Sequence, residues 1–273
     1  AAERVEQGVP LSPELDQALL HGSSIGGARP KALLDGGENG LIAKFSSTTD
    51  TYPVVKGEFV AMELARRAGL KVAPVQLTSA HGRDVLLVER FDRLSGGRRL
   101  AIVSALTMLG LSVAGARYGS YAELADEIRA RFTEPKATLR ELFSRIVFNI
   151  LCSNTDDHPR NHAAFWDGEV LSLTPAYDIC PQLRGGGEAA QIMAIGRNGW
   201  RMSQVAGCVG HAGIYQLSEA EAREIIDHQI ETIEGQWDEV CDLAGLTEIE
   251  RAGFWKRQFL NPYSLEEYTR NSR

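Results

Sequence analysis

A stretch with strong helical periodicity runs directly into the most polar segment of this chain. In residues 139–151 the apolar side chains recur at i, i+3, i+4 and i+7, which predicts an amphipathic to nearly buried helix. A polar segment follows at 154–161, with the sequence NTDDHPRN, and two short strands are predicted after it, at 163–166 and 170–174. Polar side chains this dense beside a buried helix indicate either an Asx-rich turn that hydrogen-bonds to itself or a functional loop.

The polar segment carries residues suited to phosphoryl transfer. Asp156 and Asn161, five positions apart in a loop, can converge on one point, where the carboxylate accepts a hydroxyl proton and the amide oxygen binds Mg²⁺. Asp178 follows the strand pair, 17 residues beyond Asn161, and could bridge Mg²⁺ to a triphosphate. Taken singly, each of these residues has a turn or capping role as its alternative.

The N-terminal part offers two further features. A glycine/serine loop at 22–27 would let backbone N–H groups approach phosphate oxygens, although most such loops are only connections. Lys44 lies in an apolar strand, where alternation puts it on the same face as Ile42. It either points to solvent or is buried against an anion, and Glu58 on the following helix is the candidate partner.

The order of the predicted elements indicates the fold class. Strands are expected at 32–34, 41–45, 72–78 and 85–89 with one helix at 55–69, and the rest is mainly helical, including a helix from the capping box at Ser218 to about Ile233. A glycine loop, a strand lysine, a base with an asparagine, a strand pair and an aspartate follow the order of a protein kinase. We therefore expect an α+β, protein-kinase-like two-lobed fold, with a small β-rich N-lobe at 1–92 and a larger helical C-lobe at 93–273.

Composition excludes several other classes. The net charge is −7 and the only compact basic feature is the pair Arg98-Arg99 at an expected loop tip, so direct nucleic-acid binding is disfavoured. No apolar run approaches the ~18 residues that a membrane helix needs. The four cysteines lack the spacing of a zinc or redox motif, which favours reduced thiols in the cytoplasm.

Three segments resemble the signatures of one known family, the HipA-type toxin kinases. They are SIGGARPK at 24–31, TDDHPRN at 155–161 and TPAYDI at 174–179, and the segment VERFDR at 88–93 resembles the hinge of that family. The resemblance spans about residues 22–180. Arg160 is a departure, because family members commonly carry a lysine there.

The resemblance implies roles for individual residues. Asp156 would be the catalytic base, Asn161 and Asp178 the Mg²⁺ ligands, Lys44 the ATP-phosphate lysine, and Glu89 and Phe91 the backbone contacts to adenine. Further nucleotide contacts would come from the loop and its flanks, namely Ser24, Ile25, Gly26, Gly27, Ala28, Lys31 and His158. Taken alone, His158 has a structural hydrogen-bonding role as its alternative.

The resemblance also implies regulation and partners. Ser24, or the adjacent Ser23, would be autophosphorylated, and the phosphate would silence the kinase because it cannot share the pocket with the phosphates of ATP. Known targets in the family include aminoacyl-tRNA synthetases, and partners include a helix-turn-helix DNA-binding antitoxin.

Two other functions stay open at this point. A small-molecule kinase of the aminoglycoside or choline type shares the Asp-x₄-Asn arrangement, but it would need an acidic pocket for a cationic acceptor. A non-catalytic protein on a kinase scaffold, such as a corepressor subunit, is disfavoured because all of the expected catalytic positions are intact.

Overall fold

Two small antiparallel sheets frame the structure, a computed structural model that describes residues 31–34, 40–47, 49–80, 82–184 and 187–270. The first sheet has the strand order β1-β2-β4-β3 and the second has the order β5-β6-β7. The strands are β1 (Lys31–Leu34), β2 (Leu41–Phe45), β3 (Val75–Ala80), β4 (Arg83–Glu89), β5 (Ala101–Ser104), β6 (Ala163–Trp166) and β7 (Leu171–Leu173).

Helices make up most of the remainder. They are α3 (Val54–Arg67), α4 (Ala105–Met108), α5 (Tyr121–Arg131), α6 (Pro135–Leu151), α7 (Val205–Gly210), α8 (Glu219–Leu243) and α9 (Glu248–Phe254). Short 3₁₀ turns are η1 (Ser95–Gly97), η2 (Ala116–Tyr118), η3 (Pro159–Asn161), η4 (Ala212–Tyr215) and η5 (Pro262–Leu265).

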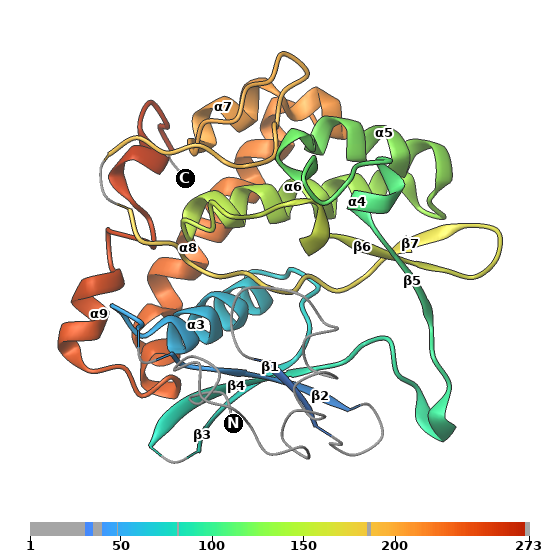
Figure 1. Cartoon of the computed structure of the whole chain (residues 1–273). Helices are drawn as coiled ribbons and strands as arrows, with labels where there is room; N and C mark the ends of the chain where they lie inside the picture. Colours follow the sequence, from blue (N-terminus) through green and yellow to red (C-terminus); the bar gives the residue numbers. More distant parts are fainter. Residues whose placement is uncertain (1–30, 35–39, 48, 81, 185–186, 271–273) are drawn as a thin grey trace.

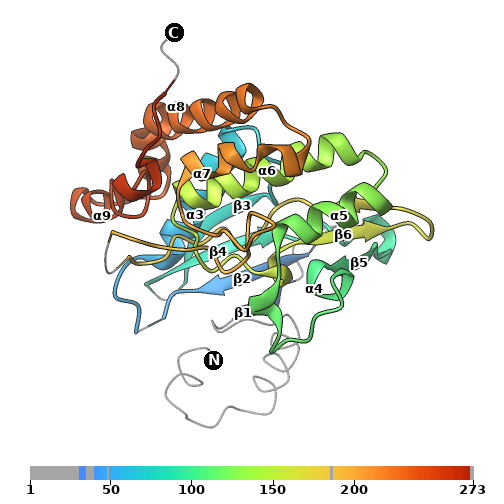
Figure 2. The same cartoon turned by 90° about the horizontal axis from the view of Figure 1, so that it is seen from above.

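The layers follow from these elements. Figure 1 shows the first sheet at one end of the molecule, α3 lying against it, and α5, α6 and α7 beyond α3. The second sheet lies beside α4 and α5, as Figures 1 and 2 both show. One continuous hydrophobic core runs from Val55 on α3 to Leu260 near the C-terminus, so the sheet part and the helical part share it.

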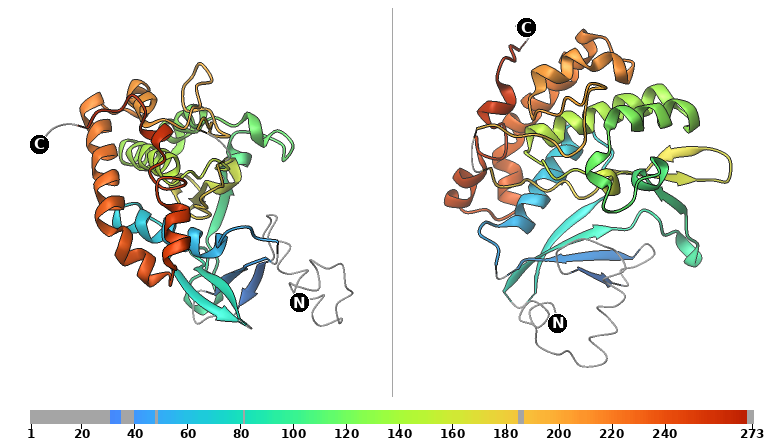
Figure 3. Two further views of the ribbon diagram at one scale, coloured as in Figure 1. Left: turned by 90° about the vertical axis from the view of Figure 1, so that its left-hand side faces the viewer. Right: turned by 45° about the horizontal axis from the view of Figure 1, so that its top comes forward.

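The C-terminal helices pack on α3 rather than only on the helical part. In Figure 3 the α8–α9 segment, orange to red, follows one side of the molecule down to α3. Phe254 of α9 stacks edge-on against Tyr52, with 6.1 Å between ring centroids. It also lies so close to Gly57 that a Cβ there would come within 2.7 Å of the Phe254 ring. Glycine is therefore required at this point of α3 for the close approach of α9.

Most of the predicted elements are confirmed, with shifts at their ends. α3 begins one residue before the predicted helix at 55–69, and the chain turns out of it at Gly69, whose φ is +86°. The strand expected at 72–78 instead covers Val75–Ala80, because Val72 pairs with Ala176 of a distant segment.

One predicted end was wrong. The capping box at Ser218 is present, but α8 continues ten residues past Ile233 to Leu243. Trp237, Val240 and Cys241 continue the buried stripe of the helix, so packing carries it beyond Gly235.

Several expectations concern the chain as a whole. All four cysteines are free thiols. No described helix combines the length and apolarity needed to cross a bilayer. The glycine/serine loop at 22–27 lies outside the described residues, and the lobe boundary at 92/93 stays a prediction.

Candidate active site

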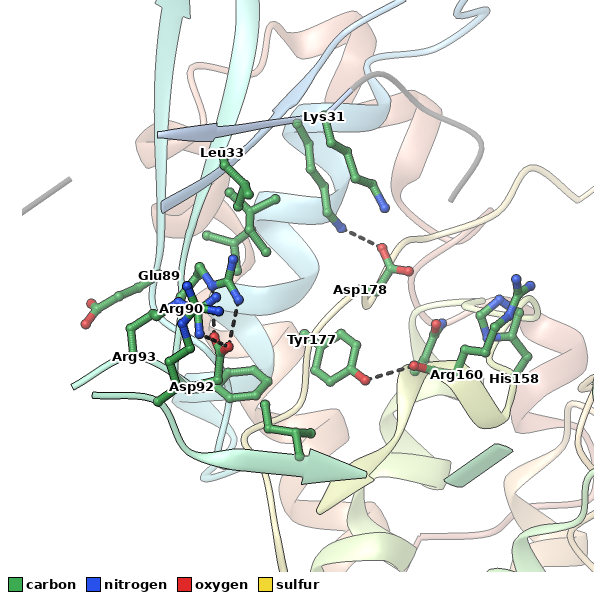
Figure 4. A pocket seen from close by; sticks show the side chains of 17 residues that line it. Lys31, Leu33, Glu89, Arg90, Asp92, Arg93, His158, Arg160, Tyr177 and Asp178 are labelled. Carbon is green, nitrogen blue, oxygen red and sulfur yellow. Dashed lines mark hydrogen bonds and ion pairs between the residues drawn. The ribbon is translucent and has the colours of Figure 1, made fainter. Parts of the chain in front are cut away.

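A pocket of about 570 Å³ lies between the first sheet and the loop that precedes β6 (Figure 4). One wall comes from the strands and the β4–β5 connection, and the other from η3 and the segment around Asp178. The volume is within the range of small-molecule and cofactor sites. Of the residues singled out from the sequence, the pocket is lined by Lys31, Lys44, Glu89, Phe91, His158, Asn161 and Asp178.

Lys44 is the centre of the pocket's electrostatics. The Lys44 residue is only 7% exposed. Its ammonium donates hydrogen bonds to the carboxylates of Glu58 and Asp178, the latter at 2.5 Å. Glu58 comes from α3 and Asp178 from the segment after β7, so one lysine joins three elements. The predicted Lys44–Glu58 ion pair is confirmed, and the alternative of a solvated strand lysine is excluded.

Burial and pairing act against each other in this triad. Burial lowers the pKa of Lys44, but the negative charges of Glu58 and Asp178 more than reverse that effect, so the net pKa is raised. Burial raises the pKa of Glu58, and the attraction of Lys44 offsets only part of this rise. Burial also opposes ionisation of Asp178, but Lys44 and Lys31 leave its pKa lowered. Lys44 therefore stays charged, facing the pocket.

A second lysine stands beside Lys44. In the register of β1 and β2, Lys31 is directly opposite Lys44, so both project from the same face of the sheet. Figure 4 shows Lys31 reaching toward the side of the pocket where Asp178 lies. Burial and the charge of Lys44 lower the pKa of Lys31, with Asp178 and Glu58 opposing. Two adjacent cations in a partly buried pocket suit a ligand with several negative charges.

Asn161 and Asp178 can be tested as a magnesium pair. Both line the pocket, Asn161 from η3 and Asp178 from a backbone position at φ +61°, a left-handed conformation that few side chains adopt. Among the described residues no three His, Cys, Asp or Glu side chains gather around one point as a complete metal cage. One carboxylate and one amide oxygen fit the alternative that Mg²⁺ prefers, in which phosphate oxygens and water complete the shell.

The segment 154–161 separates an exposed aspartate from a buried one. Asp156 is exposed and is not among the residues that line the pocket. Asp157 is buried, and its Oδ2 accepts hydrogen bonds from the Tyr121 hydroxyl, from Asn149 Nδ2 at 2.9 Å and from His162 Nε2 at 2.7 Å. The Asp157 side chain therefore anchors the loop to α5, α6 and the start of β6, while Asp156 faces outward.

Two further contacts hold this loop. The Ile192 N–H donates to the Thr155 carbonyl at 3.3 Å, which ties the loop to the segment before α7. Pro159 packs against Gly119, where an added Cβ would come within 2.3 Å of the proline ring. The self-bonded Asx turn considered from the sequence does not describe this loop, since the side chains of Asn154 and Asp157 hydrogen-bond to residues of other elements rather than to the backbone of the loop.

The opposite end of the pocket is formed by the end of β4. The Glu89 N–H donates to the Pro74 carbonyl at 2.9 Å, and Figure 4 shows the Glu89 side chain pointing away from the pocket. The Phe91 ring packs against Phe165 and Tyr177, with centroid distances of 5.8 and 5.6 Å. A flat apolar surface beside the end of a strand suits a planar heterocycle, and the backbone contacts expected from Glu89 and Phe91 stay a prediction.

Sequence reasoning missed several residues of this site. Tyr177 lines the pocket and donates a hydrogen bond to the Arg160 carbonyl at 2.8 Å (Figure 4). Its position directly before Asp178 was the available signal. Arg90, Arg93 and Arg99 also line the pocket, and the buried Asp157 network was not predicted. The signal for Asp157 was the Asp-Asp pair, but nothing in the sequence identifies its partners.

The remaining predicted residues are less constrained. His158 lines the pocket, and its Nδ1 is buried without a hydrogen-bond partner among the described residues. Ser23, Ser24, Ile25, Gly26, Gly27 and Ala28 lie outside the described residues, and their roles stay predictions.

Comparison with known proteins identifies relatives over most of the chain. The family described as HipA-like C-terminal domain matches residues 23–237. A Sinorhizobium fredii protein named as a kinase, Y4mE, is 31% identical over 149 residues, which are 50% of this chain and 33% of that protein. The serine/threonine-protein kinase toxin HipA of Shewanella oneidensis is 29% identical over 145 residues, 46% of this chain and 34% of that protein. The matched region thus spans about a third of the length of these curated relatives.

Solved structures agree on the fold. A complex of HipA, HipB and operator DNA from Shewanella oneidensis contains a chain with a TM-score of 0.71 at 23% identity, covering 88% of this chain and 62% of that one. The proinflammatory kinase CtkA of Helicobacter pylori has a TM-score of 0.53 at 19% identity, covering 84% of this chain and 93% of that one. The kinase-like fold expected from the sequence is confirmed.

Proposed function

The chain belongs to the family of HipA-like C-terminal domains, and we propose that it is a serine/threonine protein kinase that transfers the γ-phosphoryl group of ATP to a protein. We further propose that it acts as the toxin of a toxin–antitoxin system. Its cofactors would be ATP and Mg²⁺. The relatives named as kinases support the phosphoryl-transfer part of this proposal.

The observation that carries the proposal is the Lys44–Glu58–Asp178 triad. A buried lysine that is fixed by a helix carboxylate and faces a multiply charged pocket is the arrangement that aims an ammonium at nucleotide phosphates. A binding scaffold without catalysis has no need for a buried charge, because desolvating a lysine and a glutamate is costly. The triad therefore favours a kinase over a non-catalytic corepressor.

Each residue has a distinct task in the proposed reaction. Lys44 and Lys31 would bind phosphate oxygens, and Asn161 and Asp178 would hold Mg²⁺, which supplies charge neutralisation when bound. Phe91 would orient the base from the opposite end of the pocket. Asp156, exposed and free of a hydrogen bond among the described residues, would accept the proton of the incoming serine or threonine hydroxyl.

The acceptor and partner are proposed by analogy with the relatives. An aminoacyl-tRNA synthetase is the candidate acceptor, and a helix-turn-helix DNA-binding antitoxin is the candidate partner. The complex of HipA with HipB and operator DNA supports the second of these. Autophosphorylation at Ser24 or Ser23 would place a dianion beside the nucleotide phosphates and so silence the kinase.

Intact-mass measurement and peptide mapping test the proposal. The wild-type chain and Asp156→Ala would be incubated with ATP and Mg²⁺, with and without a candidate synthetase. We expect one added phosphate at Ser24 or Ser23 in the wild type and none in Asp156→Ala. Phosphate transfer by Asp156→Ala at the wild-type rate would show that Asp156 is not the catalytic base. Turnover of a small cationic acceptor with no phosphoserine would identify a small-molecule kinase instead.

A further inference from the structure

The connection between β4 and β5 folds back on itself as a small hairpin, residues 90–100, here called the arginine hairpin. Arg93 and Arg99 pair across it in an antiparallel bridge, and the Leu94 N–H donates to the Arg98 carbonyl at 3.0 Å. η1 forms its tip, where Gly96 and Gly97 both have φ +75°. Figure 1 shows this segment projecting from the edge of the molecule between β4 and β5.

The arginine hairpin carries more positive charge than its surroundings neutralise. Its four arginines face a single carboxylate, Asp92, which accepts hydrogen bonds from Arg90 at 2.8 and 2.6 Å and pairs with Arg93 at 3.0 Å. Arg98 and Arg99 are exposed, and no acidic side chain among the described residues forms an ion pair with either. Two guanidinium groups therefore remain for a partner.

The cations of the hairpin also repel one another. Burial lowers the pKa of Arg93, and Arg90 and Arg99 lower it further, whereas Asp92 opposes the shift. Clustering like charges on an exposed loop is unfavourable unless an anionic partner relieves it. The arrangement is thus suited to binding rather than to stabilising the hairpin itself.

The position of the hairpin connects it to the site. Arg93 and Arg99 line the end of the pocket that β4 and its connection to β5 form, whereas Arg98 does not line the pocket. The hairpin leads into β5, and beyond the far end of β5 the Ala105 N–H donates to the His162 carbonyl at 2.8 Å, directly after the 154–161 loop. A segment bound to the hairpin would therefore lie at the end of the pocket opposite Asp178, and it must extend across the cleft for a hydroxyl to reach the 154–161 loop.

Charge selects the class of partner. The chain has 36 acidic against 29 basic residues, so the hairpin is a local basic feature on an acidic protein. A nucleic acid needs a basic surface that follows many consecutive phosphates, and the acidic remainder would repel the continuing strand. A short run of aspartates or glutamates in a protein can match the two remaining guanidinium groups without extending over the acidic remainder of the surface.

We propose that the arginine hairpin is a docking arm for an acidic segment of the protein acceptor. The proposal rests on the proposed kinase function and adds the chemistry by which an acceptor is recognised. Arg98 and Arg99 bind carboxylates of the acceptor, and the serine or threonine that reaches Asp156 stands farther along the acceptor chain, across the cleft.

Fluorescence anisotropy with a labelled peptide tests the docking arm without requiring phosphoryl transfer. The probe is a fluorescein peptide with one serine flanked by glutamates, and its control replaces every glutamate by glutamine. The variant is Arg98→Glu, at a residue outside the pocket. Arg257→Glu is the matched control, because Arg257 is also exposed and the substitution changes the net charge equally.

We expect the glutamate peptide to bind the wild type more tightly than the glutamine peptide. Arg98→Glu should weaken its binding by about fivefold, since an exposed attraction becomes a repulsion, whereas Arg257→Glu should leave it within about twofold. The KM for ATP should stay the same in Arg98→Glu. Equal binding of the two peptides, or equal losses in the two variants, would overturn the docking arm.

Further outcomes distinguish the docking arm from a nucleic-acid site and from the proposed kinase function. A duplex DNA or RNA of equal charge could bind the wild type more tightly than the glutamate peptide does, and Arg98→Glu could abolish that binding. This result would identify a nucleic acid as the partner and refute the proposal. A wild-type chain that binds the glutamate peptide as described but transfers no phosphate to any acceptor would support the arm while refuting the kinase function. Phosphate transfer to a protein, together with equal binding of the glutamate and glutamine peptides, would support the kinase function while refuting the arm.

Discussion

Replacing Lys44 by methionine should destabilise the protein strongly, because it leaves Glu58 buried without its cation. Methionine keeps the apolar length of the side chain and removes only the charge. Glu58 is 4% exposed, so its carboxylate cannot exchange the lysine for water. Asp178 is different: 36% of its side chain is exposed, so solvent screens much of its interaction with Lys44.

The expected loss in the free energy of unfolding follows from the buried Lys44–Glu58 pair. Removing one partner of a buried ion pair costs about 3–5 kcal/mol. We expect the lower end, about 3 kcal/mol, because Glu58 can escape its isolated charge by taking up a proton. For a chain of this size that corresponds to a fall in Tm of about 6–12 °C. Lys56→Met is the matched control, since Lys56 on the same helix pairs with Glu250 at 3.6 Å and donates to the Gly245 carbonyl at 3.0 Å, and the loss of these two contacts should cost about 1 kcal/mol.

The pH dependence gives a second, independent check. The raised pKa of Lys44 means that its contribution to stability is present at every pH below its ordinary value of 10.5. The lowered pKa of Asp178 means that its contribution is present above its ordinary value of 3.8 and is lost as the pH falls. The deficit of Lys44→Met should therefore be largest near neutral pH and shrink on acidification, as both carboxylates become neutral.

Urea unfolding of the three proteins, followed by circular dichroism at several pH values, measures these differences. A deficit for Lys44→Met no larger than that for Lys56→Met at neutral pH would refute the reasoning. So would a deficit that grows as the pH is lowered. Adding Glu58→Gln to Lys44→Met should recover part of the lost stability, because the uncompensated charge is then absent.

Three other substitutions test separate parts of the structure. Gly119→Ala should cost about 1–3 kcal/mol and lower the kcat of the proposed kinase, because its Cβ would meet Pro159 and displace the 154–161 loop; wild-type kcat and stability would show that the loop yields freely. Asp157→Asn should cost about 1–3 kcal/mol in urea unfolding, since one amide cannot accept from all three of its donors, and unchanged stability would contradict the network. Ser218→Ala should cost about 1 kcal/mol by removing the N-cap of α8, without changing the KM for ATP, and a change in that KM would mean that the helix end is coupled to the site.

The parts of the site that follow from local patterns could be predicted from the sequence. Strand alternation placed Lys44 on the face of Ile42, and both line the pocket. The helix predicted after the strand at 41–45 carries Glu58, which made it the candidate partner of Lys44. Polar density after a buried helix identified the loop that contains Asn161. Each of these inferences uses neighbours within one or two elements, which a periodic pattern can specify.

The parts that depend on contacts between distant elements could not be predicted. Tyr121 and Asn149 reach Asp157 from two separate helices, and no spacing in the sequence specifies that meeting. The end of α8 was placed too early because the packing of Trp237 and Val240 outweighs the interruption by Gly235. Arg98 and Arg99 were recognised as a loop tip, but only the hairpin geometry shows that Arg99 lines the pocket.

The packing of α3 bears on how the proposed kinase could be controlled. On one side Glu58 is fixed by Lys44, and on the other Gly57 is in contact with Phe254 of α9, so an outward swing of α3 would have to break the ion pair and shift the C-terminal helices together. In this chain both faces of α3 are occupied, by the Lys44–Glu58 pair and by Phe254. In the proposed kinase, control would therefore come more easily from blocking the nucleotide, as the proposed phosphate on Ser24 would do, than from repositioning α3.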